Sequence, residues 1–352
     1  MTSMKNWQEI LRQSVTTFAD LQKHLNCDNN ALEDVIATFP MRINPYFLGL
    51  IQKHGAPLSR QAVPNILEIQ DTVGVSDPLD EDNLSPVNNL VHKYPDRALF
   101  LVTNRCAMYC RFCTRKRKVG TEKMRITAKS LEDCYLYLRA TPQIREVLIS
   151  GGDPLLLEDD KLEDILRRLR EIPSIEVLRI GTRVPGTLPM RITKQLVDML
   201  KRYHPLYINT HFNHPLEITA EAKAACNLLA DGGIPLGNHT VLLKGINDSS
   251  EILRRLFLDL LKIRVKPYYL FQTDLTCGTN HFRTSTAKGI AIMRDLIGHI
   301  SGMAIPTYAL DAPGGKGKIP LTPEYIINHG ADLSFTNYTG EICHYPEPVD
   351  SF

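Results

Sequence analysis

The sequence has almost no excess of charge and no long hydrophobic run. Its 352 residues carry 41 Lys and Arg against 39 Asp and Glu, which leaves a formal net charge of +2. This balance gives no general reason to expect a nucleic acid or an anionic membrane as a partner. No apolar run approaches the ~18–20 residues that cross a bilayer, and the opening residues MTSMKNWQEILRQS lack the apolar core of a signal peptide. We therefore expect a cytoplasmic protein.

Cysteine is scarce, and its distribution excludes one class of protein. Five of the eight cysteines are scattered, as expected for reduced thiols in the cytoplasm, and these are Cys27, Cys134, Cys226, Cys277 and Cys343. A secreted domain built on disulfides is therefore not expected. The other three cysteines lie within eight residues of one another and need a separate explanation.

Three zones of the chain differ in their patterns. Apolar residues recur at helical spacing through residues 1–70, and residues 71–96 are rich in Asp, Pro and Asn, which is typical of an irregular connection. We take 1–90 as an N-terminal helical extension with its linker, 91–305 as the core domain, and 306–352 as a short C-terminal segment. With 43% hydrophobic residues, the composition is that of an ordinary globular protein.

Short apolar runs alternate with amphipathic stretches from Arg97 onward. We expect strands at 98–102, 147–150, 176–181, 206–210, 234–243, 265–271 and 304–310. We expect helices at 128–139, 159–171, 193–203, 219–231, 250–262 and 286–299. About six strand-then-helix units in series predict an α/β fold with a parallel sheet covered by helices, and the absence of a long crossover favours a partial (β/α)6-type barrel. The active site of such a barrel lies at the carboxyl ends of its strands.

Three cysteines follow the first barrel strand in the segment TNRCAMYCRFCTRKRK. Cys106, Cys110 and Cys113 have the spacing Cys-x3-Cys-x2-Cys, and three thiolates can hold three irons of a [4Fe-4S] cluster while the fourth iron stays open to a ligand. Cations flank them and are expected to lower the thiol pKa values: Arg111, Arg115, Lys116, Arg117 and Lys118. The alternative is zinc, but structural zinc usually takes four ligands, often in paired Cys-x2-Cys units, and the sequence has no second pair.

The same spacing after a barrel strand resembles the signature of the radical S-adenosylmethionine (SAM) superfamily. The next strand ends in ISGGDPL, which resembles the glycine-rich SAM-binding motif of that superfamily. Gly151 and Gly152 permit a close approach of the backbone to a ligand, and Asp153 follows them. A glycine pair alone is more often a turn, so this motif gains its meaning from its place in a chain that carries the three cysteines.

A loop rich in glycine and lysine lies in YALDAPGGKGKIPL, residues 308–321, near the end of the barrel. A lysine in a loop of this kind can bond an aldehyde, and glycine N–H groups can bind a phosphate, which together favour pyridoxal phosphate (PLP). The loop contains two candidate lysines, Lys316 and Lys318. The alternative of a basic surface loop stays open on this segment alone.

Over nearly its whole length the chain resembles the lysine 2,3-aminomutase family. The matching stretches are FPMRINPY (39–46), RQAVP (60–64), DPLDEDNLSPV (77–87), HKYPDRALF (92–100), CAMYCRFCTRKR (106–117), SGGDPL (150–155), NTHFNHP (209–215), HTVLLKGIND (239–248), QTDL with HFRT (272–284) and DAPGGKGKIP (311–320). The resemblance implies a radical interconversion of L-α-lysine and β-lysine that uses SAM, a [4Fe-4S] cluster and PLP. It also implies an electron donor such as flavodoxin or ferredoxin, and it allows a homo-oligomer.

The resemblance also implies roles for particular residues. PLP falls on Lys318, and Lys316 replaces a family glycine, so Lys316 is the alternative. Arg115 falls on the arginine that binds the substrate carboxylate. Asp274 and Asp311 fall on the aspartates that hold the substrate ε-ammonium, which favours lysine over glutamate. Five further residues are expected to line the SAM and PLP cavity or to approach the PLP phosphate: His211, Asn238, His239, Lys93 and Arg97.

One departure and several alternatives accompany the resemblance. Longer family members have a C-terminal cysteine cluster that binds zinc between subunits, whereas this chain has only Cys343 beyond the lysine loop, so we expect no zinc. The substrate could instead be another amino acid, or the lysine loop could bind an anion in a SAM-consuming enzyme. A non-catalytic iron–sulfur electron carrier is a further alternative. The β-lysine could serve catabolism, an osmolyte, an antibiotic or the modification of elongation factor P.

Overall fold

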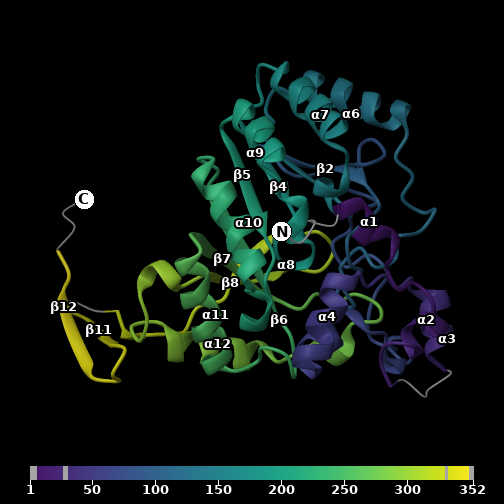
Figure 1. The fold of residues 1–352 in the computed structure, drawn as a ribbon. Coiled ribbons are helices and arrows are strands. Elements are labelled where there is room, and N and C mark those ends of the chain that lie inside the picture. The colour runs from purple at the N-terminus through teal and green to yellow at the C-terminus, as the bar shows by residue number, and fades with distance from the viewer. Residues whose placement is uncertain (1–5, 27–30, 330–331, 349–352) are drawn as a thin grey trace.

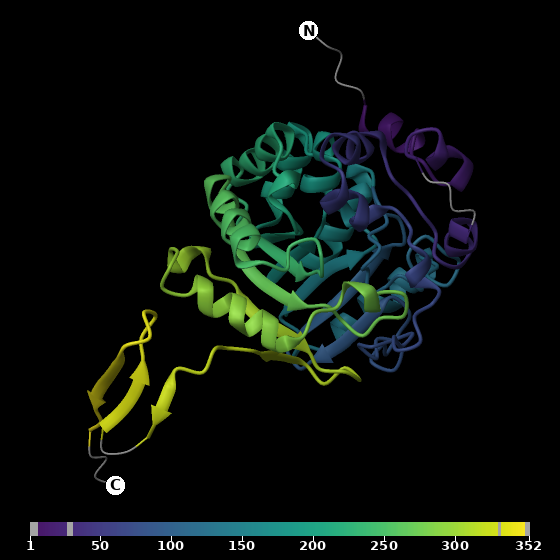
Figure 2. The same ribbon diagram turned by 90° about the horizontal axis from the view of Figure 1, so that it is seen from below.

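A mostly parallel sheet, curved into a partial barrel, forms the centre of the molecule (Figures 1 and 2). The computed structural model describes residues 6–26, 31–329 and 332–348. In these ranges the barrel sheet has nine strands, each paired with the next in chain order. They are β1 (Leu90–Tyr94), β2 (Arg97–Thr103), β3 (Glu146–Gly151), β4 (Val177–Gly181), β5 (Leu206–Thr210), β6 (Leu236–Leu242), β7 (Val265–Gln272), β8 (Thr307–Asp311) and β9 (Lys318–Pro320). Strands β2 to β8 are parallel, whereas β1 and β9 are antiparallel edge strands. The expected partial β/α barrel is confirmed.

Helices cover the outside of the parallel strands and connect them (Figure 2). They are α6 (Ala128–Ala140), α7 (Asp159–Arg170), α8 (Val184–Thr187), α9 (Lys194–Leu200), α10 (Ala220–Asp231), α11 (Ser250–Lys262) and α12 (Thr286–Leu296). Most begin at a hydroxyl side chain that accepts a hydrogen bond from a backbone N–H group of the first turn, and these caps are Thr127, Thr193, Thr219, Ser249 and Ser285. The helices expected from the sequence are therefore present, with small shifts at their ends.

Successive side chains of a strand point alternately to the outer face of the barrel, which is packed against helices, and to its inner face, which is open. In β3, Val147 and Ile149 are fully buried in the core shared with the helices, while Leu148 and Ser150 line the cavity inside the barrel. Strand β6 shows the same alternation of buried and half-buried residues. Burial of the outer row removes apolar surface from water, which stabilises the fold by about 25 cal/mol per Å². The inner row is left free to carry the polar groups of a site.

Short helices of the N-terminal extension pack on the loop that carries the three cysteines. They are α1 (Trp7–Arg12), α2 (Phe18–Gln22), α3 (Ala31–Thr38), α4 (Pro45–His54) and α5 (Ala56–Ala62). Phe47 of α4 and Met108 of the cysteine loop belong to one buried apolar cluster. Asn44 Nδ2 donates to the carbonyl oxygens of Ala107 and Thr187, at 3.0 and 2.9 Å. The extension therefore supports the cysteine loop from behind.

Two parts of the fold differ from the sequence-based prediction. The sequence predicts an irregular connection over 71–96, but β1 lies within it and pairs with β2 through a tight turn. The sequence predicts only the lysine loop in the C-terminal segment, but β9 and a second sheet are also present there. The second sheet consists of β10 (Ile326–Asn328), β11 (Asp332–Thr336) and β12 (Ile342–Pro346) and stands apart from the barrel (Figure 2). These strands are short and mostly exposed, so they lack the pattern that identifies buried strands.

Two further expectations concern membranes and thiols. No helix in the described ranges is both long and apolar enough to cross a membrane. The scattered cysteines that the structure describes are not in disulfides, and Cys134 and Cys226 are buried in the barrel core. Cys27 lies outside the described residues.

Shortening a buried side chain of the barrel is expected to cost far more than the same change in the second sheet. Ile180 in β4 is fully buried, whereas Ile342 in β12 is 64% exposed. Ile180→Ala should therefore lower the free energy of unfolding by about 2–5 kcal/mol, and Ile342→Ala by roughly 0.5 kcal/mol or less. Urea unfolding followed by circular dichroism measures both values. Equal losses in the two variants would contradict this assignment of the core.

Candidate active site

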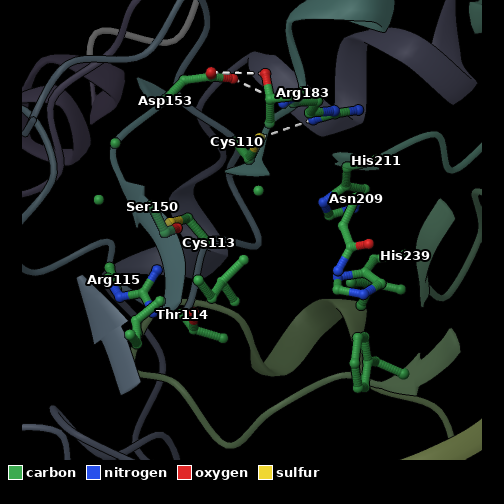
Figure 3. A pocket seen from close by; sticks show the side chains of 18 of the residues that line it. Cys110, Cys113, Thr114, Arg115, Ser150, Asp153, Arg183, Asn209, His211 and His239 are labelled. Carbon is green, nitrogen blue, oxygen red and sulfur yellow. Dashed lines mark hydrogen bonds between the residues drawn. The ribbon is translucent and has the colours of Figure 1, made fainter. Parts of the chain in front are cut away.

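A cavity of about 600 Å³ lies inside the barrel and reaches the carboxyl ends of its parallel strands. Side chains from the cysteine loop, the strand ends and the lysine loop surround it, and Figure 3 shows part of this wall. The expected site residues that line it are Lys93, Arg97, Cys106, Cys110, Cys113, Arg115, Gly151, Gly152, Asp153, His211, His239, Asp274, Asp311 and Lys318. Residues separated by more than half of the sequence thus meet around one space.

The three cysteines lie on the loop after β2. Cys106, Cys110 and Cys113 are half-buried and line the cavity, and Figure 3 shows Cys110 next to Arg183 and Cys113 next to Ser150. Burial raises the pKa of the Cys113 thiol to about 11 and that of Cys106 well above its ordinary value. No three His, Cys, Asp or Glu side chains in the described ranges are arranged to hold a single metal ion. Three thiols on one loop are, by contrast, the donor set of a cluster with several irons.

Burial raises the pKa of the Cys113 thiol and outweighs Arg115 and Lys116, which lower it as the sequence predicts, so the net shift is upward. Arg111 and Lys116 are buried and donate to the carboxylate of Glu68, with Lys116 Nζ 2.6 Å from Glu68 Oε2. Arg117 and Lys118 pair with aspartates of the connection that precedes β1. Each of these cations also has a carboxylate partner. The buried Arg111 and Lys116 anchor the cysteine loop through Glu68.

Arg183, which follows β4, contacts a cysteine although no sequence motif identifies it. Its Nη1 donates to Cys110 Sγ at 2.8 Å, and its Nη2 donates to Gln61 Oε1 at 2.5 Å and to Glu217 Oε2 at 3.0 Å (Figure 3). Glu217 is fully buried and also accepts two backbone N–H groups. The signal available in the sequence is position alone, because Arg183 follows directly on a barrel strand, where functional side chains gather.

Gly151 and Gly152 lack side chains because protein backbone lies against them. A Cβ on Gly151 would lie 2.2 Å from the carbonyl oxygen of Thr103, and one on Gly152 would lie 2.3 Å from that of Arg105. The backbone N–H of Gly152 donates to the Thr103 oxygen at 2.5 Å. The sequence predicts a close approach to a ligand here, and the structure shows that the glycines also admit the start of the cysteine loop. Both glycines line the cavity.

Asp153 joins the ends of β3 and β4. Its Oδ1 accepts a hydrogen bond from Thr182 Oγ1 at 2.7 Å, and its Oδ2 accepts one from the backbone N–H of Arg183, also at 2.7 Å (Figure 3). Burial raises the pKa of this carboxyl group, and the hydrogen bonds oppose the shift. Asp153 therefore fixes the backbone from which the Arg183 side chain extends toward Cys110.

A group of carboxylates and amines forms another part of the wall. Lys318 Nζ lies 3.2 Å from Asp311 Oδ1, and Lys93 Nζ lies 3.5 Å from the same oxygen. Burial and the neighbouring charge of Asp311 raise the pKa of Asp274 to about 7, although Lys318 and Lys93 oppose the shift. Two carboxylates sharing a buried site repel each other, and the two lysines offset only part of this repulsion at Asp274.

The two candidate lysines of the glycine-rich loop have different surroundings. Lys318 is half-buried and lines the cavity, with its Nζ 5.9 Å from the centre of the Tyr94 ring and 5.4 Å from that of Phe271. Arg97 stacks on the Tyr94 ring at 3.9 Å. Lys316 is exposed and lies outside the cavity wall. Of these two described lysines, Lys318 is the one that faces a ligand in the cavity.

Several buried polar atoms on cavity-lining residues have no hydrogen-bond partner in the described structure, among them Asn209 Nδ2, Thr210 Oγ1, His239 Nε2, Arg179 Nε and Arg183 Nε. Buried polar groups are normally paired, so such a set indicates a missing polar ligand. Burial lowers the pKa of His239 to about 3 and that of His211 well below its ordinary value, so both rings are neutral. Neutral imidazole rings and amides can both donate and accept hydrogen bonds, so this part of the wall suits a polar ligand.

Asn238 is the exception among the residues expected around the cavity. It is fully buried, and its Oδ1 accepts the backbone N–H of Phe212 at 2.8 Å. Its Nδ2 donates to the Phe212 carbonyl oxygen at 3.1 Å and to Thr240 Oγ1 at 2.7 Å. The side chain is thus engaged in joining β6 to the segment after β5. The structure gives no support to the expected contact of Asn238 with a cofactor, because its polar atoms are already paired.

Known proteins resemble this chain over most of its length. The family model described as lysine-2,3-aminomutase matches residues 293–352, and that of the radical SAM superfamily matches residues 100–256. The L-lysine 2,3-aminomutase of Acetoanaerobium sticklandii is 49% identical, covering 97% of this chain and 84% of its own. That of Fusobacterium nucleatum is 47% identical, covering 97% and 82%. The glutamate 2,3-aminomutase of Clostridioides difficile is 45% identical, covering 93% and 78%.

Removing the charge of Glu68 is expected to destabilise the protein. Glu68→Gln leaves Arg111 and Lys116 as buried cations without their carboxylate, which should cost about 3–5 kcal/mol of the free energy of unfolding. As a control, Glu176→Gln breaks the exposed pair with Arg145 and should leave the free energy of unfolding nearly unchanged. Urea unfolding of both variants measures the difference. If Glu68→Gln costs no more than the control, the buried carboxylate does not anchor the loop.

Proposed function

Because the chain belongs to the lysine 2,3-aminomutase family and carries its radical SAM core, we propose that it is an isomerase that interconverts L-α-lysine and β-lysine with SAM, a [4Fe-4S] cluster and PLP. The observation that carries the proposal is that the three cysteines of the cluster motif, the loop lysine Lys318 and the aspartates Asp274 and Asp311 line a single cavity. Each group by itself has an ordinary alternative: a zinc site, a surface loop or a structural ion pair. Their convergence favours one reaction centre.

The described residues fit both cofactors. Cys106, Cys110 and Cys113 would hold the cluster, which together with SAM supplies an organic radical able to remove hydrogen from an unactivated carbon. Lys318 would hold PLP, which supplies the group that carries the migrating amino nitrogen. Lys93 and Arg97 would offer cations to its phosphate. The unpaired polar atoms of the cavity wall supply the remaining hydrogen-bond partners for such ligands.

The substrate would be bound at its two ends. Arg115 would bind the α-carboxylate, and Asp274 and Asp311 would bind the ε-ammonium. The raised pKa of Asp274 comes from burial and from the neighbouring carboxylate, so an ammonium placed between the two carboxylates would relieve the repulsion. Fixing both ends of a flexible chain places the β carbon at one position relative to SAM, and such orientation lowers the barrier. The enclosed barrel also keeps water from the radical.

The two carboxylates favour lysine over glutamate as the substrate. Glutamate would bring a third carboxylate toward Asp274 and Asp311, and like charges at such a site repel. A glutamate 2,3-aminomutase is nevertheless among the relatives, at 45% identity, so family membership alone does not choose the substrate. The choice rests on these two side chains. An aminomutase that acts on another amino acid is the alternative.

The setting of the reaction follows from the same proposal. A cluster that cleaves SAM needs an electron, so a flavodoxin or ferredoxin would act as the donor. We place the enzyme in the cytoplasm, with a small amino acid as its substrate and no nucleic acid or membrane as a partner. It could act as a homo-oligomer. The β-lysine could feed catabolism, an osmolyte, an antibiotic or the modification of elongation factor P.

The proposed function is tested by anaerobic reconstitution of the full chain with iron, sulfide and PLP, followed by incubation with SAM and a reductant. β-Lysine should form from L-lysine and not, at a comparable rate, from L-glutamate. The variant with Cys106, Cys110 and Cys113 all changed to Ala should lose the iron and the product together. Equal turnover of both amino acids, or full iron content in the triple variant, would contradict the proposal.

Lys318, rather than Lys316, is expected to bind PLP covalently. Lys318 lines the cavity beside Asp311 and the Tyr94 ring, whereas Lys316 is exposed outside it. Borohydride reduction followed by peptide mapping should therefore find the pyridoxyl group on Lys318. Lys318→Ala should lose the visible absorbance of bound PLP, and Lys316→Ala should keep it. A label on Lys316 would show that the loop binds PLP in another register.

The reaction with lysine is expected to depend on pH through Asp274. Its pKa is raised to about 7, so below pH 7 the carboxyl is increasingly protonated and loses its attraction for the substrate ammonium. The kcat/KM for lysine should thus fall about tenfold per pH unit below 7 and level off above it. Asp274→Asn should lower kcat/KM and abolish its fall below pH 7. Asp231→Asn, which breaks an exposed pair with Arg264, should leave the pH profile unchanged. If kcat/KM still falls below pH 7 in Asp274→Asn, a group other than Asp274 causes the pH dependence.

A further inference from the structure

The connection 71–84, called the strap below, runs across three loops at the mouth of the barrel. At its first end, Asp71 Oδ2 accepts the backbone N–H of Gly278 at 2.7 Å. Val75 forms a parallel bridge with Thr276, in which Val75 N donates to the Leu275 carbonyl oxygen at 2.8 Å. This loop follows β7 and begins with Asp274. The strap therefore holds the backbone next to one of the two aspartates proposed to bind the substrate ammonium.

The second end of the strap holds the lysine loop. The backbone N–H of Gly314 donates to the Pro78 carbonyl oxygen at 3.0 Å. A Cβ on Gly315 would lie 2.5 Å from Leu84 Cδ1 and 2.9 Å from the Leu79 carbonyl oxygen, so the two segments are in close contact. Gly315 also has a φ of +71°, which a residue with a side chain rarely adopts. The position of the lysine loop is thus set against the strap.

Between its two ends the strap contacts the cysteine loop through Glu81 and Arg115. Arg115 Nε lies 3.0 Å from both carboxylate oxygens of Glu81, and its Nη2 lies 2.7 Å from Glu81 Oε1. Glu81 is buried, and both residues line the cavity. Burial alone would lower the pKa of Arg115, but the Glu81 carboxylate outweighs it and raises that pKa. In the described structure no protein group accepts a hydrogen bond from the third nitrogen, Nη1.

We propose that Glu81 is a positioning residue, which holds Arg115 by Nε and Nη2 so that Nη1 is presented to the carboxylate of the substrate. The inference rests on the proposed function, in which Arg115 binds that carboxylate. A paired contact of this kind fixes the plane of a guanidinium as well as its place. Because the strap also holds the loops of Asp274 and Lys318, it sets the three substrate anchors relative to one another. A long arginine side chain without Glu81 would have many rotamers instead of one.

An opposite role for Glu81 can be stated and tested. As a carboxylate on Arg115 it could compete with the substrate carboxylate, and its removal would then improve lysine binding. As a positioning residue it leaves Nη1 free, and its removal weakens lysine binding and disturbs the geometry for hydrogen transfer. The two roles predict opposite changes in KM.

The test uses Glu81→Gln, Glu81→Asp and the control Asp82→Asn in the full, reconstituted chain. Asp82 is the next residue of the strap, but its side chain is 61% exposed and pairs with Arg117 and Lys118 outside the cavity wall. Glu81→Gln should raise the KM for lysine about tenfold. It should also release several times more 5′-deoxyadenosine, the product of SAM cleavage, per β-lysine formed, because SAM is then cleaved without productive hydrogen transfer. Glu81→Asp keeps the charge and should recover part of the loss. Asp82→Asn should stay within about twofold of the unmodified chain.

A second measurement needs no turnover. Lysinamide lacks the carboxylate of lysine, so lysine should raise the thermal unfolding midpoint of the unmodified chain more than lysinamide does. Glu81→Gln should lose this difference, and Asp82→Asn should keep it. A protein in which Glu81 had only a structural role would lose stability without losing the discrimination. If Glu81→Gln does not fold, the lysine and lysinamide midpoints are compared in Glu81→Asp, which should show a smaller difference than the unmodified chain.

The outcomes separate the inference from the proposed function. A higher KM, more uncoupled 5′-deoxyadenosine and lost discrimination in Glu81→Gln, with Asp82→Asn unaffected, support the inference. An unchanged or lower KM in Glu81→Gln, with β-lysine still formed, overturns the inference and leaves the proposed function standing. An unmodified chain that forms no β-lysine and is not stabilised by lysine contradicts the proposed function and, with it, the inference.

Discussion

Glu68 is a buried carboxylate that accepts hydrogen bonds from two cations of the cysteine loop, Arg111 and Lys116. Neither cation could be buried alone, since an unpaired charge away from water costs several kcal/mol. Arg111 also donates to the carbonyl oxygen of Pro40 in the N-terminal extension. Buried ion pairs and a hydrogen bond therefore hold the cysteine loop to the extension. The geometry of the three thiols depends on this attachment.

A second buried network connects the cysteine loop to the barrel. Arg183 links Cys110 to Glu217, and Asp153 fixes the backbone of Arg183. Gly152 lies directly against the backbone of Arg105, so no side chain separates the end of β3 from the start of the cysteine loop. Backbone contact on one side and paired charges on the other confine the loop. Such confinement gives fixed thiol positions before any cofactor binds, which is the condition for a pre-organised site.

The cavity wall contains two neighbouring carboxylates and several buried polar atoms without partners in the part of the chain that the structure describes. Asp274 and Asp311 lie close enough for one to raise the pKa of the other, and several buried polar atoms have no partner in the described residues. Both features cost free energy in the absence of ligands, whereas a large cluster of buried apolar side chains packs behind the cavity wall. A fold tolerates such a cost where binding relieves it. The outward-facing side chains of the strands pack and stabilise the barrel, and the inward-facing side chains include the unpaired polar groups.

The sequence by itself determined the local features of this protein. The hydrophobic periodicity gave the parallel strands and helices, and the cysteine spacing identified the loop that follows β2, because each of these depends on residues within a few positions of one another. Motifs and resemblance together then identified fourteen of the residues that line the cavity. Only the tertiary structure decided which polar side chains meet: it paired Glu81 with Arg115, turned Arg183 toward Cys110 and engaged Asn238 on the backbone of Phe212. It also placed Lys318 in the cavity and Lys316 outside it. These pairings join segments far apart in the chain, and the direction of a side chain depends on packing that no local pattern contains.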